Sequence, residues 1–217
     1  MGSKLGTSGL SVYDEKLWGN YRAIVLNNND PLKLGRIKAE VIPYFVGIDQ
    51  SIIPWAVPKN PMVEGAGIGI GSSNIPAVGS KVWVFFEMGD AYQPVYDGEA
   101  SDGVSGLPSD MTTNYPNRKV QKTACGITTV IDNTAKTYKV YTAGGLVFLI
   151  NDTAKTITLT HPTGAFIEID PTGQILLNGV NIVVTTTGTT TWTGTGSISI
   201  ISTGAVSVTG SAVNINP

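Results

Sequence analysis

The chain has 217 residues, only 14% of them charged, and a formal net charge of −2 at pH 7. Charged residues usually make up about a quarter of a globular protein, and this chain contains no basic block that would favour nucleic acid or an anionic membrane. No apolar run approaches the ~20 residues of a transmembrane helix, and residues 1–10 lack the apolar centre of a signal peptide. A single cysteine excludes an internal disulfide framework and fits folding in a reducing cytosol.

Five short segments with period-two alternation predict a small antiparallel barrel in the first half of the chain. After an N-terminal arm at residues 1–19, Ile37, Ala39 and Val41 should share one face of the second strand. The opposite face of that strand, with Arg36, Lys38 and Glu40, is expected in solvent. The five strands are expected at residues 21–27, 35–43, around Trp55, 81–87 and 94–100. Five strands without crossover helices predict an all-β protein whose five-stranded OB-fold barrel occupies residues 20–103.

The same residues carry a family pattern. It runs from a Tyr-led strand through Asp-Pro and Gly-Arg to a Trp-Ala-Pro-like strand, then to Val-Gly, Val-Trp-Val-x-Phe-Glu-x-Gly-Asp and Pro-Val-x-x-Gly. These motifs stand at Tyr21, Asp30-Pro31, Gly35-Arg36, Trp55 to Pro58, Val78-Gly79, Val82 to Asp90 and Pro94 to Gly98. Over residues 18–99 the chain therefore resembles the contractile phage tail central spike and baseplate assembly protein V family, which is related to the valine-glycine repeat spike proteins of type VI secretion.

The resemblance implies a structural protein and not an enzyme. It would be a homotrimeric central spike that attaches through its barrel to the baseplate hub or tail tube, and that pierces the bacterial outer membrane when the tail contracts. It would belong to the tail baseplate of a virion assembled in the host bacterial cytoplasm. The spike of a phage-derived injection particle or of a type VI secretion system is the alternative. Within the motifs, Trp83 and Phe85 or Phe86 are expected in the core, and Gly89-Asp90 in a hairpin.

A predicted linker at residues 104–124 leads into an internal repeat. Gly126, Gly145 and Gly164 lie nineteen residues apart, and each opens a short strand that ends in Asp132, Asn151 or Asp170. The second strands of the three repeats are YKVY, ITLT and ILLN. The pattern predicts a β-meander over residues 125–180. A repeat that cannot bury its own face needs stacked neighbours, and the resemblance implies that such meanders lead into a three-chain prism.

The last part of the chain, residues 171–217, contains no Asp, Glu, Lys, Arg or His. Thr, Ser and Gly alternate there with Val and Ile, which is the period of a strand with two different faces. Because a lone chain would leave its strand edges unpaired, the pattern favours an intertwined trimeric β-helix, a triangular prism, over residues 181–217. The alternatives are a disordered tail, which is usually charged, or an aggregation-prone repeat. The residues expected on the trimer axis are Ile198, Ile200, Val206, Val208, Val213 and Ile215.

A glycan-processing enzyme and a nucleic-acid-binding protein are the alternatives from other function classes. A glycan-processing enzyme needs paired carboxylates, but the acidic residues in question fall at strand ends and in a hairpin, where they are normally solvated. Cys125 has no histidine near it in sequence, and His161 precedes a proline in a predicted turn. A nucleic-acid-binding OB-fold is opposed by the net charge of −3 over residues 1–103. The carboxylates considered for the enzyme are Glu87, Asp90, Asp97 and Glu99. We expect no catalytic, cofactor-binding or metal site and no bound nucleic acid.

We expect the end of the needle to lack a closing group of its own. Short phage spikes of the family often end in a His-x-His pair that gathers an iron on the threefold axis, whereas this chain ends VNINP without histidine. The family offers a separate conical cap of the proline-alanine-alanine-arginine (PAAR) repeat type as the other solution. We therefore expect such a tip protein, in contact with Val213, Ile215 and Pro217.

Overall fold

The computed structural model describes residues 16–62, 65, 69–103, 106–210 and 213. In this range the protein is all-β apart from two short 3-10 turns, Glu87–Gly89 and Ser109–Met111, which confirms the predicted class. None of the described helices has the length and apolar character needed to cross a membrane. The chain divides into two compact units between Val120 and Gln121, and each unit is described separately.

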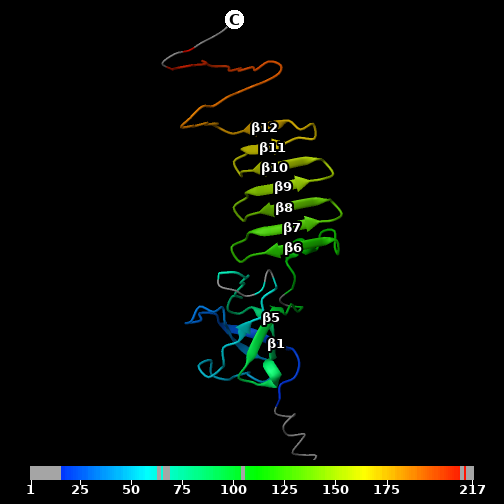
Figure 1. Cartoon of the computed structure of the whole chain (residues 1–217). Coiled ribbons are helices and arrows are strands. Elements are labelled where there is room, and N and C mark those ends of the chain that lie inside the picture. Colours follow the sequence, from blue (N-terminus) through cyan, green and yellow to red (C-terminus); the bar gives the residue numbers. More distant parts are fainter. Residues whose placement is uncertain (1–15, 63–64, 66–68, 104–105, 211–212, 214–217) are drawn as a thin grey trace, which may run out of the picture. The chain divides into compact units, whose positions relative to one another are not determined.

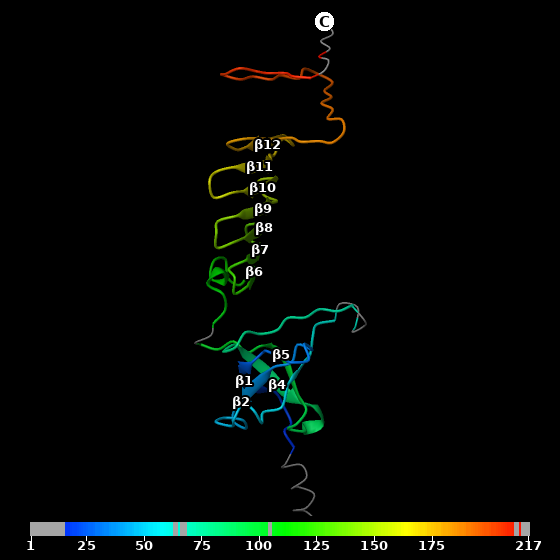
Figure 2. The ribbon, with the colours of Figure 1, turned by 90° about the vertical axis from the view of Figure 1, so that its left-hand side faces the viewer.

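The first unit contains a five-stranded sheet, in the order β2-β1-β4-β5-β3, that curls into a barrel (Figures 1 and 2). Backbone hydrogen bonds between Ile37 and Ala56, of 3.0 and 2.7 Å, join the residue just before β2 to the residue just before β3 and bring the two ends of the sheet together. The five-stranded barrel is thus confirmed. Its strands are β1 (Tyr21–Asn27), β2 (Lys38–Val41), β3 (Val57–Pro58), β4 (Lys81–Phe86) and β5 (Pro94–Glu99).

Strand alternation decides which side chains fill the barrel. Ile37, Ala39 and Val41 are all buried, as their spacing predicts. The aromatic residues of β4 are only partly as expected, because Phe86 is buried with Val82 and Val84, whereas Trp83 and Phe85 are half-buried on the other side of the strand. The expectation that Trp83 belongs to the core is therefore wrong. The core cluster comprises Ala23, Val25, Ile37, Ala39, Val41, Ala56, Val82, Val84, Phe86 and Tyr96.

The polar face of the second strand differs from the prediction of full solvation. Arg36, Lys38 and Glu40 are half-buried, because each side chain ties down a loop. The Lys38 ammonium donates to the carbonyls of Gln50 and Ser51 at 2.7 and 2.8 Å. One carboxylate oxygen of Glu40 accepts the N–H of Gly47 at 3.1 Å.

Arg36 forms an ion pair with the buried carboxylate of Asp30. The two guanidinium–carboxylate hydrogen bonds measure 2.6 and 3.0 Å, and the carboxylate also accepts the backbone N–H groups of Leu32 and Leu34. A carboxylate that accepts several hydrogen bonds is stabilised in its charged form. These bonds, with the Arg36 bond the strongest influence, hold the pKa of Asp30 well below its usual range.

We expect the Asp30 pair to make the barrel sensitive to acid. A carboxyl whose folded pKa lies below its unfolded value of about 3.9 stabilises the fold above that pH, and this contribution is lost as the pH falls below it. Asp30→Asn should therefore lower the melting temperature at pH 7, and its difference from the unchanged protein should shrink steadily as the pH falls below about 4. Thermal melts of both proteins from pH 7 to pH 2.5 measure the difference. An equal gap at every pH would contradict this role.

The second unit is a seven-stranded sheet whose strands follow in chain order (Figure 1). From β7 onward each strand pairs antiparallel with the next, so this part is a meander. The first strand, β6, lies within residues predicted as a linker, so the sheet starts earlier than the predicted boundary at residue 125. The strands are β6 (Arg118–Lys122), β7 (Thr128–Asp132), β8 (Thr137–Tyr141), β9 (Val147–Asn151), β10 (Thr156–Thr160), β11 (Phe166–Ile169) and β12 (Ile175–Asn178).

The nineteen-residue repeat appears in the turns as well as in the strands. Asp132, Asn151 and Asp170 each use a side-chain oxygen to accept N–H groups of the turn that follows, which is the predicted Asx-type turn. At the opposite edge of the sheet, Gly126 has a φ of +83°, and a Cβ there would lie 2.8 Å from the Cβ of Ala143. Glycine is thus required at the turn for both conformation and space.

Beyond β12 the chain contains no regular strand in the described residues 179–210 and 213, and these residues are exposed. The predicted needle falls on this part. In a β-helix made of several chains, the strands that would pair with these residues belong to the other chains.

Candidate functional site

The strand register divides the meander from β7 to β12 into two faces. Residues directly opposite each other in paired strands point to the same side of the sheet. Ile150, for example, stands between Tyr138 on β8 and Ile157 on β10. Followed from strand to strand, this register places twelve residues on one side, and eleven of them are apolar. This apolar face consists of Thr129, Ile131, Tyr138, Val140, Phe148, Ile150, Ile157, Leu159, Ile167, Ile169, Ile175 and Leu177.

The other side of the same strands is mixed. It carries the three charged side chains of β7 to β12, those of Asp132, Lys139 and Glu168, and is called the polar face. Threonines and asparagines lie beside them. The same side also carries six apolar residues, Val130, Tyr141, Val147, Leu149, Phe166 and Leu176. The Lys139 ammonium lies 4.9 Å from the centre of the Tyr141 ring. The polar face is thus less apolar than the other face, although Thr128, Val130 and Asp132 on β7 are buried in the single chain.

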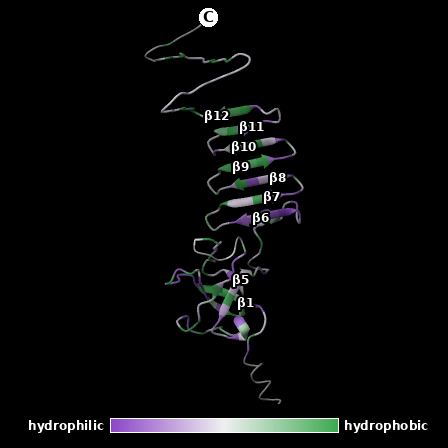
Figure 3. Ribbon diagram, in the orientation of Figure 1, coloured by the Kyte–Doolittle hydropathy of each residue, from purple (hydrophilic) through white to green (hydrophobic). Residues whose placement is uncertain are grey.

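The apolar face is open in a single chain. The side chains of Ile131, Leu159 and Ile175 are 40%, 49% and 67% exposed. Strands β9, β11 and β12 are largely hydrophobic, whereas β6 is hydrophilic (Figure 3). Soluble monomers rarely expose a continuous apolar patch beyond a few hundred square ångströms. This face is therefore the candidate assembly surface of the protein.

The residues predicted for the needle axis lie outside this face. Ile198, Ile200, Val206, Val208 and Val213 are each at least half exposed in a single chain. Ile215 and Pro217, which were expected to contact a tip protein with Val213, lie outside the described residues. The sequence-based selection missed the apolar face. The sequence does contain a pattern that could have identified this face. Within the repeats, apolar residues recur at every second position, at 148 and 150, 157 and 159, and 167 and 169.

The acidic residues considered for catalysis have local roles. Asp90 accepts the N–H of Tyr92 at 2.9 Å within the turn that follows β4. The Asp97 carboxylate pairs with the Lys59 ammonium at 2.7 Å on the barrel surface. Glu87 and Glu99 are exposed.

The remaining candidates for chemistry lie in turns of the second unit. Cys125 is exposed between β6 and β7, with its sulfur 3.1 Å from the hydroxyl of Thr123. That hydrogen bond is the main cause that lowers the pKa of the thiol. His161 lies in the turn between β10 and β11, as predicted, and its Nδ1 is 2.7 Å from the hydroxyl of Thr163. Within the described residues, no three His, Cys, Asp or Glu side chains form a group that could hold a metal ion.

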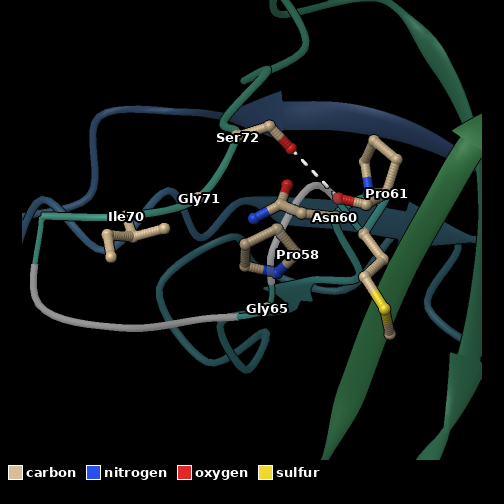
Figure 4. A pocket seen from close by; sticks show the side chains of 8 residues that line it. Pro58, Asn60, Pro61, Gly65, Ile70, Gly71 and Ser72 are labelled. Atoms are coloured by element: carbon tan, nitrogen blue, oxygen red, sulfur yellow. Dashed lines mark hydrogen bonds between the residues drawn. The ribbon is translucent and has the colours of Figure 1, made fainter.

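A pocket of about 320 Å³ lies in the long loop that follows β3. The Ser72 hydroxyl donates to the carbonyl of Pro61 at 3.1 Å across its wall (Figure 4). The described residues of its lining carry no charged group, so none of them offers a ligand an ion pair or acid–base chemistry. The lining residues are Pro58, Asn60, Pro61, Met62, Gly65, Ile70, Gly71 and Ser72.

Comparison with known proteins adds a finding on the barrel. No curated protein matches the chain. Residues 21–99, however, match the family described as the type VI secretion system/phage-baseplate injector OB domain. The matched range begins at the first residue of β1 and ends at the last residue of β5, so it covers the whole curled sheet. This chain therefore carries, at residues 21–99, an OB domain of the phage-baseplate and type VI injector family to which the baseplate spike proteins belong.

Proposed function

We propose that the protein is the homotrimeric central spike of a contractile tail baseplate. The observation that carries the proposal is the apolar face of the meander, which stands next in the sequence to a baseplate injector OB domain. A row of exposed isoleucines and leucines destabilises a single chain in water but stabilises an assembly in which copies cover one another.

Three copies can cover one another's apolar faces completely. Three sheets with their apolar faces turned inward form a closed prism with a continuous dry interior, and the charged side chains lie on the other faces. Two copies packed face to face would also cover the apolar residues. The number three follows from the likeness to trimeric spikes, so the mass of the assembly separates the two arrangements.

The mechanism is mechanical. Sheath contraction drives the tube, and the spike transmits the force to the bacterial envelope. Bending a closed β-prism requires many backbone hydrogen bonds to break together, which makes the needle stiff. Because residues 171–217 carry no ionisable side chain, the needle avoids the cost of several kcal/mol for each charge that enters lipid.

The proposed partners follow from this arrangement. The barrel engages the hub or the end of the tail tube, the needle faces the outer membrane, and a PAAR-type protein caps the strands near Val213. The protein belongs to the virion tail, after assembly in the host cytoplasm. The spike of a phage-derived injection particle or type VI apparatus is the second candidate, because the matched family covers both kinds of injector.

Electron microscopy of assembled particles tests the proposal. Antibody fragments raised against the barrel should decorate the end of the tail tube, at the centre of the baseplate. Particles produced without this chain should lack the central density and fail to penetrate cells. Decoration along the sheath or tail fibres, with the central density unchanged, would refute the assignment.

A further inference from the structure

The last residues of the barrel are held by side chains of two neighbouring strands. The Arg22 guanidinium, on β1, donates one hydrogen bond to the carbonyl of Ala100 and another to that of Ser101, both 3.0 Å long. The same guanidinium lies 4.8 Å from the centre of the Trp83 ring on β4. The stacked ring restricts the arginine to the rotamers that reach the two carbonyls.

A second contact secures the residue that follows. The Lys81 ammonium, at the start of β4, pairs with the carboxylate of Asp102 at 2.5 Å, and both side chains are partly buried. The N–H of Ala100 also donates to the carbonyl of Lys81 at 3.0 Å, and Ala100 is only 1% exposed. Residues 100–102 are thus held by backbone, guanidinium and ammonium contacts together, although they follow the end of β5.

A bulge directs the chain into these contacts. Val82 pairs with Glu99 and Trp83 with Asp97, so Gly98 has no partner on β4. Its φ of +60° lies in the left-handed region that glycine adopts without strain. A bulge at a strand end changes the direction of the chain, and here it brings the Ala100 carbonyl to Arg22.

We infer that Arg22, Trp83, Lys81 and Asp102 form a latch that fixes the chain where it leaves the barrel. The latch itself does not depend on the proposed function, but its purpose does. In a spike, force between barrel and needle passes along this covalent connection, and the latch spreads that force over β1 and β4. Without the latch, force on the chain would break the hydrogen bonds between residues 99–100 and β4 one after another.

Hydrogen exchange of the full chain tests the latch. Arg22→Met keeps an unbranched side chain over Trp83 but removes both hydrogen bonds, so amides in residues 99–102 should exchange at least about tenfold faster, because local opening becomes easier. Amides of β1 and β4 should change much less. Arg22→Lys, which keeps the charge, should restore part of the protection.

Lys59→Met is the matched control. Lys59 also lies over an aromatic ring, Phe85 at 5.7 Å, but it pairs with Asp97 on β5, which precedes the exit residues 100–102. Exchange in those residues should stay unchanged in this variant. The latch is refuted if Arg22→Met leaves their exchange unchanged, or if it accelerates all barrel amides equally. Loss of the trimer with an intact exchange pattern would instead refute the spike function and leave the latch standing.

Discussion

Leu159→Lys should abolish assembly of the chain. Leu159 lies on the apolar face, opposite Phe148 on β9 and Ile167 on β11. In a closed assembly, the change would place one ammonium group from each chain in a dry interior without an acidic partner. Burying an unpaired charge costs several kcal/mol, and each chain would pay it separately. Analytical ultracentrifugation of the variant should show single chains or soluble aggregates where the unchanged protein shows one assembled species.

Thr158→Lys is the control for this substitution. Thr158 is the adjacent residue on β10 and points to the polar face, opposite Glu168 on β11. A lysine there gains an oppositely charged neighbour across the strands, so the assembly should be retained. Equal loss of assembly in both variants would show that the apolar face is not the contact surface between chains.

Val208→Asp should disrupt the needle while the meander still holds the chains together. If the alternating residues of the last segment face the axis, three carboxylates would meet in an apolar interior, where their mutual repulsion and desolvation raise their pKa values and oppose packing. We expect an assembled species whose segment after residue 180 is cut by protease at least about tenfold faster than in the unchanged protein.

Asp at the neighbouring Ser207 should be tolerated, because successive residues of a strand point to opposite faces. Limited proteolysis followed by mass spectrometry measures both variants. Equal sensitivity at the two positions would refute the inward and outward assignment of Val206 and Val208. Rapid cleavage of the unchanged protein at the same sites would show that residues 181–217 form no needle.

Local alternation was sufficient to predict much of the barrel. Ile37, Ala39 and Val41 are buried because a strand that covers a core must turn every second residue inward. The prediction that Trp83 lies in the core disregarded this alternation. Its position between the buried Val82 and Val84 requires the opposite face. The Asp30–Arg36 pair was not predicted, because it depends on how the loop after β1 folds back on itself.

The assembly surface was only partly predictable. The nineteen-residue repeat identified the strands and turns of the meander and the need for neighbours. Which side chains share a face depends on the register between strands, and that register is fixed by turns such as those at Asp132 and Gly126. Strand β6 was missed because its sequence, RKVQK, has four polar residues in five. For Val206 and Val208, the pairing partners would lie on other chains, so a single chain gives no register.

The mass of the purified full chain in solution tests the central claim most directly. Native mass spectrometry or light scattering, over a hundredfold range of concentration, should give three times the 22.8 kDa of one chain. The mass should not fall on dilution, because an apolar interface of this kind dissociates slowly. A stable mass of two chains would replace the prism by a face-to-face sandwich. A mass of 22.8 kDa at every concentration would contradict the proposed spike.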